Sequence, residues 1–354
     1  MRIGIIGGSS QVGSSLALYL KHSGKAEVVC FVRSGYSNIF FELFDIPFEK
    51  IDLNNSEQLK QQLSSFDAIV DCSYPAGQLF EILPAIRKNF SAVIPSMKKE
   101  AAFIYMSSIM AYGMPAGESR IGQYAVPRSS YAYIKRGAES AAAKLCKQYG
   151  IKGYNFRLSQ VHGFLQSVNT SFREKLSGAE AVYISGSADD LTNTIFINGV
   201  CEAIIKCVTQ EVPPGLYTLV SQPQWTLQEL YTYYTSIYNP GCNLVFFQET
   251  GTPSGNRSVT SRIIGVLKRF RPLLETYILM KLPKLSIKFK GRYRQSEVFS
   301  SVYTGMHMQS IDFNLLGKPP LAVISDIQSG LQEVKEQEKA LQDMYNKIIE
   351  ENRR

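Results

Sequence analysis

The chain has 354 residues, of which 45% are hydrophobic and 19% charged, a composition typical of a globular protein with room for one large α/β domain or two lobes. The net charge of +8 is local, because segment 262–294 contains ten Lys or Arg and one acid, which leaves 28 basic and 29 acidic residues elsewhere. That distribution argues against nucleic acid as a partner.

No run of about 18 apolar residues occurs, so no membrane-spanning helix is expected. Glycines interrupt the apolar run at the amino terminus, which argues against a signal peptide. The six cysteines form no C-x-x-C pair and the three histidines are scattered. We therefore expect reduced thiols, a cytoplasmic protein and no metal site.

Short apolar segments alternate with helical patterns over the first 160 residues. The expected helices are Ser14–His22, which Gly24 ends, then SEQLKQQLSSF, and a helix that contains Tyr131. The expected strands are RIGIIGG, EVVCFVR, FEKIDLNN, AIVDCSY, AAFIYMSS and KGYNFRLS. This alternation predicts an α/β fold with a doubly wound, Rossmann-type parallel sheet.

The pattern is less regular after residue 160. Strands NTIFING and GLYTLVS flank the helix VCEAIIKCVTQ, and the helix TLQELYTYYTSIY begins with a capping box of Thr226 and Glu229. A long helix over 325–354 begins with a second box, Ser325 and Gln328. Its apolar stripe comprises Ile327, Leu331, Val334, Leu341, Met344 and Ile348. We expect a Rossmann domain over 1–160, completed by a segment near 194–220, and a smaller mixed lobe from 161–193 and 221–354.

A glycine-rich turn, GGSSQVG, lies between the first strand and the first helix. Glycines permit a tight turn and close backbone approach, and the amino terminus of a helix offers N–H groups and partial positive charge to a pyrophosphate. The alternative is a plain strand–helix turn. The residues expected to bind the cofactor here are Gly7, Ser9, Ser10, Gln11, Val12 and Gly13.

The ends of the next strands provide further cofactor contacts. An acid after the second strand is typical of NAD sites, whereas Arg33 in CFVRSG favours the 2′-phosphate of NADP. A surface arginine without a ligand is the alternative. Asp52, after the third strand, is expected near the adenine, and Ser73, after the fourth, completes the set.

Tyr131 and Lys135 lie four residues apart in SSYAYIKRGAES and share a helix face, from which Tyr133 points away. A tyrosine exchanges protons at neutral pH only when its pKa falls from about 10 to about 7, which requires about 4 kcal/mol of phenolate stabilisation. An ammonium one turn away supplies it. Ser107 and Ser108 end the fifth strand, where a hydroxyl orients the reacting oxygen. Tyr131 and Lys135, together with Ser107 or Ser108, are thus the expected catalytic residues; chance spacing on a helix is the alternative.

These segments together resemble the extended short-chain dehydrogenase/reductase family, in its NAD-dependent epimerase/dehydratase group. GGSSQVG is similar to the dinucleotide loop, SSIMAYG to the serine motif, YAYIK to the Tyr–Lys motif and FRLSQVHG to the segment that closes over the nicotinamide. The resemblance runs from Gly4 to about Leu331. It implies that Tyr131 transfers a proton, that Lys135 holds the ribose and that Ser108 orients a sugar oxygen.

The chain departs from this family at several substrate positions. Sugar dehydratases of the family carry an Asp–Glu pair where Ile109 and Met110 stand, so 4,6-dehydration is not expected. Gln160 replaces a substrate-binding asparagine, and Thr192 or Asn193 stands near the usual diphosphate-binding arginine. The residues expected to bind substrate are Ser108, Gln160 and Arg173.

We expect an NAD(P)-dependent epimerase or ketoreductase acting on an activated, nucleotide-linked sugar. Segment 262–294 mixes aliphatic residues with cations, so an alternative is peripheral contact with an anionic membrane and a lipid-linked sugar or lipid ketone as substrate. A helical hairpin on the smaller lobe explains the same segment. A non-catalytic cofactor-binding sensor or scaffold is a third alternative, and homodimer formation is left open.

Overall fold

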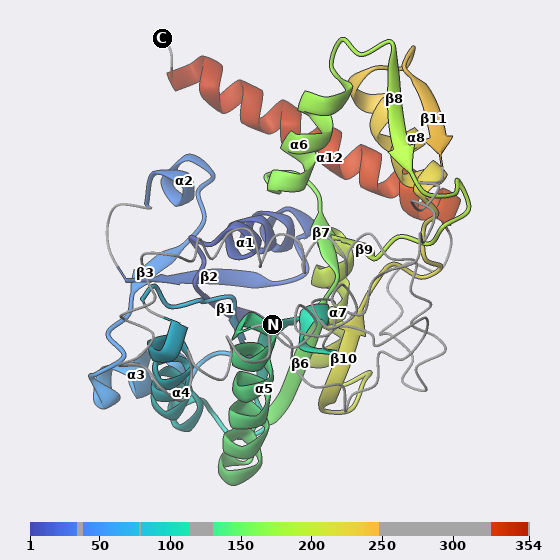
Figure 1. The fold of residues 1–354 in the computed structure, drawn as a ribbon. Helices are drawn as coiled ribbons and strands as arrows, with labels where there is room; N and C mark the ends of the chain where they lie inside the picture. Colours follow the sequence, from blue (N-terminus) through green and yellow to red (C-terminus); the bar gives the residue numbers. More distant parts are fainter. Residues whose placement is uncertain (34–37, 78, 113–129, 248–326, 353–354) are drawn as a thin grey trace, which may run out of the picture.

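The computed structural model describes residues 1–33, 38–77, 79–112, 130–247 and 327–352. Its centre is a seven-stranded sheet of order β10-β6-β5-β4-β1-β2-β3 in which every neighbouring pair is parallel (Figure 1). The strands are β1 (Arg2–Ile6), β2 (Glu27–Val32), β3 (Phe48–Lys50), β4 (Ala68–Asp71), β5 (Ala102–Ser108), β6 (Lys152–Leu158) and β10 (Gly215–Leu219). The predicted Rossmann-type α/β fold is confirmed, with a strand at each of the six segments expected before residue 160.

Helices cover both faces of this sheet (Figure 1). On one face, α1 (Gln11–Ser23) and α7 (Ile197–Val208) bury aliphatic side chains against the strands. On the other face lie α3 (Ser56–Leu63), α4 (Leu79–Ser96) and α5 (Ser130–Tyr149). Strands buried on both faces read as continuous hydrophobic runs, which explains why the sequence pattern located them.

Of the described α-helices, three escaped prediction, and one of them is α6 (Ser167–Leu176). The short α2 (Asn38–Leu43) follows β2, and α4 contains Pro84 and Pro95. Proline removes a helix hydrogen bond and disfavours helix interiors. In α4 the apolar spacing of Ile82, Ile86 and Phe90 overrides it, because all three side chains are buried against the sheet.

A second group of elements lies beyond the carboxyl end of β6. Strand β7 (Gln160–His162) pairs with β9 (Thr194–Phe196), and β8 (Ala181–Ser185) pairs with β11 (Asn243–Phe247). Helices α6 (Ser167–Leu176) and α8 (Leu227–Tyr238) pack around an aromatic core of Phe172, Phe196, Trp225, Tyr233 and Tyr234. The predicted capping box of Thr226 and Glu229 is present at the start of α8. Strand β10 joins the large sheet beside β6. The division of the chain into two lobes stays a prediction.

The last helix, α12 (Ile327–Asn352), begins within two residues of its predicted start. It buries Leu341 against the core that also contains α1, and Tyr345 stacks on Phe44. Segment 262–294 and Ser325 lie outside the described residues, so the membrane contact and the second capping box stay predictions. In the part of the chain that is described, no helix is long and apolar enough to cross a membrane.

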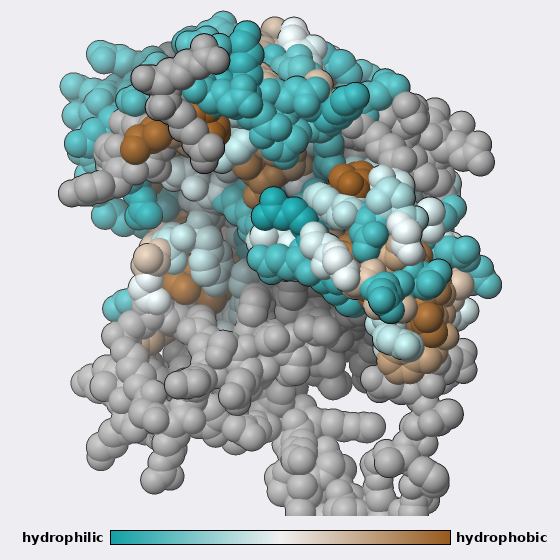
Figure 2. All heavy atoms as spheres, turned by 90° about the horizontal axis from the view of Figure 1, so that it is seen from above, coloured by the Kyte–Doolittle hydropathy of each residue, from teal (hydrophilic) through white to brown (hydrophobic). Residues whose placement is uncertain are grey.

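Seen from above, the described residues present a mostly hydrophilic surface with small, separate hydrophobic areas (Figure 2). Helix α12, at the top of Figure 1, lies on this side of the molecule. Its exposed positions include Glu336, Lys339 and Asp343, consistent with a helix that faces water along one side.

Candidate active site

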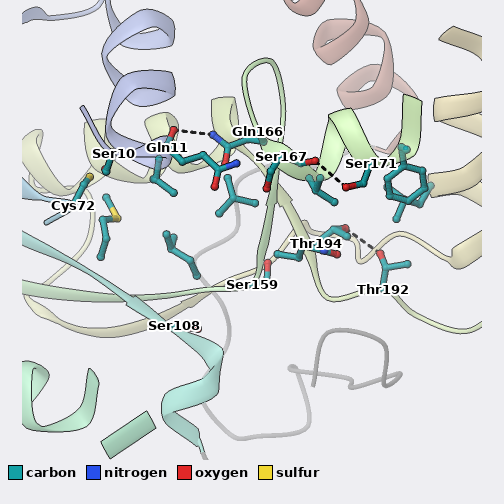
Figure 3. Close-up of a pocket in the computed structure, with 18 of the residues that line it drawn as sticks. Ser10, Gln11, Cys72, Ser108, Ser159, Gln166, Ser167, Ser171, Thr192 and Thr194 are labelled. Atoms are coloured by element: carbon teal, nitrogen blue, oxygen red, sulfur yellow. Dashed lines mark hydrogen bonds between the residues drawn. The ribbon is translucent and has the colours of Figure 1, made fainter. Parts of the chain in front are cut away.

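A cavity of ≈ 600 Å³ opens where the carboxyl ends of the central strands meet α6 and α8 (Figure 3). Ligands of open parallel sheets bind at this end of the strands. What we term the sheet wall comprises Ser10, Gln11, Val12, Cys72, Tyr74, Met106, Ser107, Ser108, Tyr131 and Lys135. The opposite, helical wall comprises Gln166, Ser167, Val168, Ser171, Phe172, Lys175, Thr192, Thr194, Leu227, Leu230 and Tyr231. Leu158, Ser159, Gln160 and Val161 line the cavity between the two walls.

The glycine-rich turn is held in one tight conformation. Gly7 has a φ of +75°, and a Cβ added to Gly13 would lie 2.3 Å from the Gly7 carbonyl oxygen. The hydroxyl oxygen of Ser10 accepts a hydrogen bond from the Gly13 N–H at 3.1 Å and caps α1. Ser10, Gln11 and Val12 therefore present the amino terminus of α1, whose first turn has no acid, to the cavity.

This arrangement fits the pyrophosphate of a dinucleotide, because free N–H groups and the positive end of a helix meet the cavity. Gly7, Ser9 and Gly13 do not line the cavity themselves, and the two glycines allow the backbone to pack closely. Ser10 is one of the residues expected to bind the cofactor; in the structure its hydroxyl oxygen serves as the helix cap, and its contact with a phosphate stays a prediction.

Tyr131 and Lys135 both face the cavity from the first turns of α5. The Lys135 Nζ lies 5.6 Å from the centre of the Tyr131 ring and donates a hydrogen bond to the Met106 carbonyl at 2.7 Å. Burial lowers the pKa of Lys135 to about 8. An ammonium this close to the ring stabilises the phenolate form of a tyrosine.

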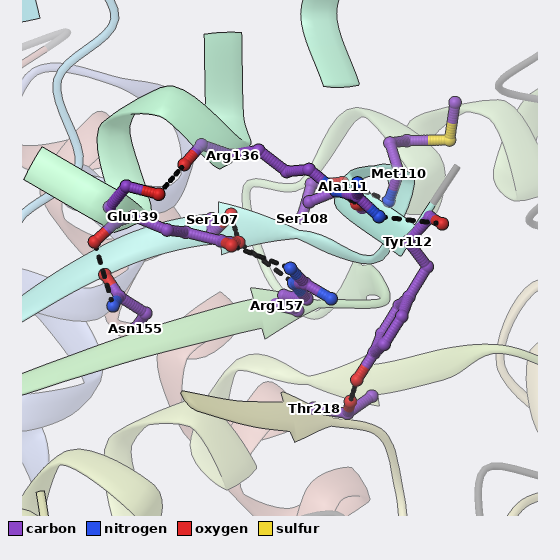
Figure 4. Close-up of polar contacts among 11 residues, drawn as sticks. Ser107, Ser108, Met110, Ala111, Tyr112, Arg136, Glu139, Asn155, Arg157 and Thr218 are labelled. Atoms are coloured by element: carbon purple, nitrogen blue, oxygen red, sulfur yellow. Dashed lines mark hydrogen bonds and ion pairs between the residues drawn. The ribbon is translucent and has the colours of Figure 1, made fainter. Parts of the chain in front are cut away.

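The two serines at the end of β5 have different partners. Ser107 donates to Glu139 Oε1 at 2.5 Å, and Glu139 also accepts from Arg157 Nε and Nη2 at 2.9 and 2.7 Å (Figure 4). Ser108 accepts the Met110 N–H at 3.2 Å, which leaves its hydroxyl proton for a ligand. The geometry distinguishes a serine that belongs to a buried ionic network from one that is available to a substrate oxygen.

Ser73 lies behind the cavity and not in its wall. Its N–H and its hydroxyl each donate to Asp71 Oδ1 at 2.7 Å. Asp71 ends β4, is 1% exposed, and burial raises the pKa of its carboxyl to about 6. Sequence reasoning assigned Ser73 to the cofactor and did not single out Asp71, although an acid inside the apolar run AIVDC was the available signal.

Besides Gly7, Ser9, Gly13 and Ser73, the predicted ligand-binding residues Arg33, Asp52 and Arg173 do not line the cavity. Arg33 and Asp52 are exposed beyond β2 and β3, and Asp52 accepts the side-chain and backbone N–H of Asn54. Arg173 is exposed on α6. Their proposed contacts with ligands stay predictions, whereas Gln160 lines the cavity as expected.

Other cavity residues were missed by the sequence analysis. Tyr74 places its ring centre 5.7 Å from that of Tyr131, and burial raises the pKa of Tyr74 to about 12, so it stays a neutral phenol. Lys175 donates to the Tyr231 hydroxyl at 3.1 Å on the helical wall. Both lie in segments without a motif, so only the fold brings them to the cavity.

A family model described as the NAD-dependent epimerase/dehydratase family matches residues 3–219, more than half of the chain. The matched region contains the glycine-rich turn, Ser108, Tyr131 and Lys135. A search of curated proteins finds no match.

Solved structures of similar fold include UDP-N-acetylglucosamine 4-epimerase from Bacillus cereus, at 19% identity and a TM-score of 0.53, with 70% of this chain and 85% of that chain covered. UDP-glucuronic acid 4-epimerase from Bacillus cereus in complex with NAD is 15% identical, with a TM-score of 0.52 and coverage of 70% and 87%. UDP-glucose 4-epimerase from Thermotoga maritima is 16% identical, with a TM-score of 0.52 and coverage of 77% and 100%. At these identities the likeness supports the fold.

Proposed function

This chain belongs to the NAD-dependent epimerase/dehydratase family, and from that membership we propose that it is an NAD(P)-dependent epimerase or ketoreductase of an activated, nucleotide-linked sugar. The observation that carries the proposal is the convergence of Ser108, Tyr131 and Lys135 on one cavity with the amino terminus of α1. When bound, the nicotinamide takes hydride from a sugar carbon or returns it. Residues that line the cavity supply the proton transfer and the contacts with the substrate.

Proton transfer is assigned to the Tyr131 hydroxyl. The Lys135 ammonium, 5.6 Å from the centre of the Tyr131 ring, stabilises the phenolate that forms when this proton leaves. Ser108, whose oxygen is fixed by the Met110 N–H, donates to the reacting sugar oxygen and holds it near Tyr131. Both directions of proton exchange use the same three residues, so they serve epimerisation and net reduction alike.

Substrate binding is assigned to the helical wall. Ser167, Ser171, Thr192 and Thr194 provide hydroxyls suited to a polyhydroxylated ligand. Lys175 supplies a cation, and its ammonium also lies 5.2 Å from the centre of the Tyr231 ring. A ligand with sugar hydroxyls and an anionic diphosphate matches this combination. Lys175 is better placed for the anion than Arg173, which points outside the cavity lining.

Turnover of a sugar nucleotide tests the proposal. UDP-glucose and UDP-N-acetylglucosamine, each with NAD or NADPH, are incubated with the full chain, and products are read by NMR. Tyr131→Phe is expected to lower kcat by about 10²–10⁴-fold, because a positioned general acid–base contributes about that much. Near-full turnover by this variant would refute the mechanism.

Tyr133→Phe is the matched control. Tyr133 lies on the same helix, packs against the core on its other side and does not line the cavity. It is expected to keep kcat within about twofold. Binding of cofactor without turnover of any activated sugar would instead favour the scaffold alternative.

A further inference from the structure

The ammonium of Lys135 is buried, with 6% of the residue exposed. It donates a hydrogen bond to the Met106 carbonyl and lies 4.8 Å from the centre of the Tyr105 ring. A buried ammonium is costly to keep charged unless an opposite charge faces it. A negative charge near Lys135 would therefore help to keep its ammonium protonated.

Titratable groups face Lys135 from three elements. The end of β4 and the residues after it contribute a carboxyl, a thiol and a phenol, β5 contributes a phenol, and α5 contributes a phenol and a carboxyl. These groups are Asp71, Cys72, Tyr74, Tyr105, Tyr131 and Glu139. Burial raises the pKa values of the thiol of Cys72 and of the Tyr74 and Tyr105 phenols, so these groups are neutral near pH 7. Two carboxylates remain as sources of negative charge.

The negative charge of Glu139 is already balanced by Arg157. Its carboxylate accepts two hydrogen bonds from Arg157 and one from Ser107, and Figure 4 shows it directed at those groups. Arg157 is itself buried, with 4% of its side chain exposed, so the charge of Glu139 is neutralised within that pair.

Asp71 is placed differently. It pairs in register with Ile6 on β1 and with Tyr105 on β5, so it lies in the middle of the sheet. Its Oδ1 accepts both bonds from Ser73, whereas Oδ2 has no hydrogen-bond partner within the described residues. Tyr105 lies beside both groups: it pairs in register with Asp71, and the Lys135 Nζ is 4.8 Å from the centre of its ring. Among the described cations, Lys135 is the one that acts on the Asp71 carboxyl electrostatically.

We propose that Asp71 is the buried counter-charge of Lys135 and acts as a positioning residue, holding the ammonium protonated beside Tyr131. The assignment deepens the proposed function and rests on it for the catalytic consequence. Asp71 does not touch the reacting atoms; it acts through Lys135. The pairing itself is a property of the fold and is testable without turnover.

The pair limits the working range of pH. Below about 6 Asp71 is protonated and the counter-charge is lost; above about 8 Lys135 loses its proton. The plot of kcat against pH should therefore fall on both sides of this window, with apparent limits that belong to the coupled pair. Asp71→Asn keeps an acceptor for Ser73 and removes the charge, so the alkaline limit should fall by about one pH unit or more.

An Asp71→Asn variant whose profile keeps both limits of the natural protein and loses only amplitude would overturn the pairing. Such a result would mean that Asp71 matters for structure alone. Asp71→Asn removes the charge with little change in side-chain size. The decisive measurement is therefore the dependence of kcat on pH and not the rate at a single pH.

A double-mutant cycle on thermal unfolding tests the pair independently of catalysis. Asp71→Asn, Lys135→Met and the double variant are compared with the natural chain at pH 7. If the charges pair, Asp71→Asn raises Tm more in the Lys135→Met background than in the natural one, because it removes an unpaired carboxylate. Equal changes in both backgrounds would overturn the proposal.

Should Asp71→Asn fail to fold, Lys135→Met alone suffices. Its loss of Tm relative to the natural chain should grow from pH 5 to pH 7.5, where Asp71 ionises and Lys135 stays charged. A difference that is flat over this range contradicts the pairing. Coupling in this test together with an active Tyr131→Phe variant would sink the proposed function and leave the pair standing.

Discussion

The sheet wall and the helical wall of the cavity hold their polar groups in different ways. On the sheet wall, Ser107 lines the cavity and donates to Glu139, which forms a buried ion pair with Arg157, and Lys135 and Asp71 are also buried. On the helical wall, the Ser171 hydroxyl donates to the Ser167 carbonyl of its own helix, and the Lys175 ammonium donates to the Tyr231 hydroxyl. The first arrangement fixes reacting groups; the second leaves polar groups ready to meet a ligand.

Burial of the Asp71 carboxyl beside the sheet wall lowers the free energy of unfolding at neutral pH. The pKa of Asp71 is raised in the fold, so its contribution to stability is largest below the unfolded pKa near 3.9 and is lost as pH rises through about 6. A shift of about two pH units corresponds to about 3 kcal/mol of destabilisation at neutral pH. Such a cost is typical of a site that is selected for chemistry.

The two walls are joined at the amino terminus of α6. The side-chain amide of Gln166 donates to the Gln11 carbonyl at 3.1 Å (Figure 3). It also donates to the Ser15 hydroxyl at 2.6 Å. The helix that carries Lys175 is thereby tied to the helix that opens with the glycine-rich turn. Changes on the sheet wall should mainly alter kcat and changes on the helical wall should mainly alter KM, because the proposed reacting groups lie on the first and the proposed substrate contacts on the second.

The largest effect is expected from breaking the buried ion pair of Glu139 and Arg157. Glu139→Gln leaves Arg157 as a buried, uncompensated cation, which should lower the free energy of unfolding by about 3–5 kcal/mol. Urea unfolding followed by circular dichroism measures the change.

Glu202→Gln is the control for this change. Glu202 forms an ion pair with Lys25, but the two side chains are 38% and 50% exposed, so its loss should cost less than about 1 kcal/mol. Similar losses in the two variants would mean that the buried network is not what stiffens the sheet wall.

A smaller effect, confined to KM, is expected on the helical wall. Lys175→Ala removes a charge-assisted hydrogen bond of about 1.5–3 kcal/mol to an anionic substrate, which corresponds to a rise of about 10–100-fold in KM with kcat nearly kept. Steady-state kinetics with the sugar nucleotide that is turned over provides the measurement.

Arg173→Ala provides the matched comparison, two residues away on the same helix. Arg173 is exposed and does not line the cavity, so its removal should change KM less than the removal of Lys175. The reverse order would restore the sequence-based assignment and contradict the division of labour between the walls.

The contrast between walls also separates what sequence could predict from what it could not. Ser10 to Val12, Ser108, Tyr131 and Lys135 follow strands or share one helix turn, so local spacing predicted the segments that reach the cavity. On α6, sequence reasoning named Arg173 and missed Lys175. Two residues rotate a helix position by about 200°, and only packing against α8 decides which side meets the cavity.

Local sequence patterns could not predict contacts between distant segments either, because packing in the folded chain decides them. Glu139 and Arg157 lie on α5 and β6, and no local pattern pairs them across the sheet. Strands β8 and β11 are short, pair only with each other and were not predicted. Their alternating exposure, with Tyr183 and Val245 exposed, gives a weaker signal than the continuous apolar runs of the central sheet.

The smallest effect is expected outside both walls, at the end of β2, and it sharpens the comparison by separating cofactor choice from chemistry. Arg33 is exposed there, so a bond from its guanidinium to a 2′-phosphate is partly screened by water. Arg33→Ala should weaken NADPH binding by about tenfold, or about 1.4 kcal/mol, and change NADH binding by less than about twofold. Arg87→Ala, an exposed arginine on α4, serves as the control, and quenching of protein fluorescence measures both dissociation constants. Equal losses for the two cofactors would show that Arg33 does not read the 2′ position, and the preference for NADP inferred from CFVRSG would then be wrong.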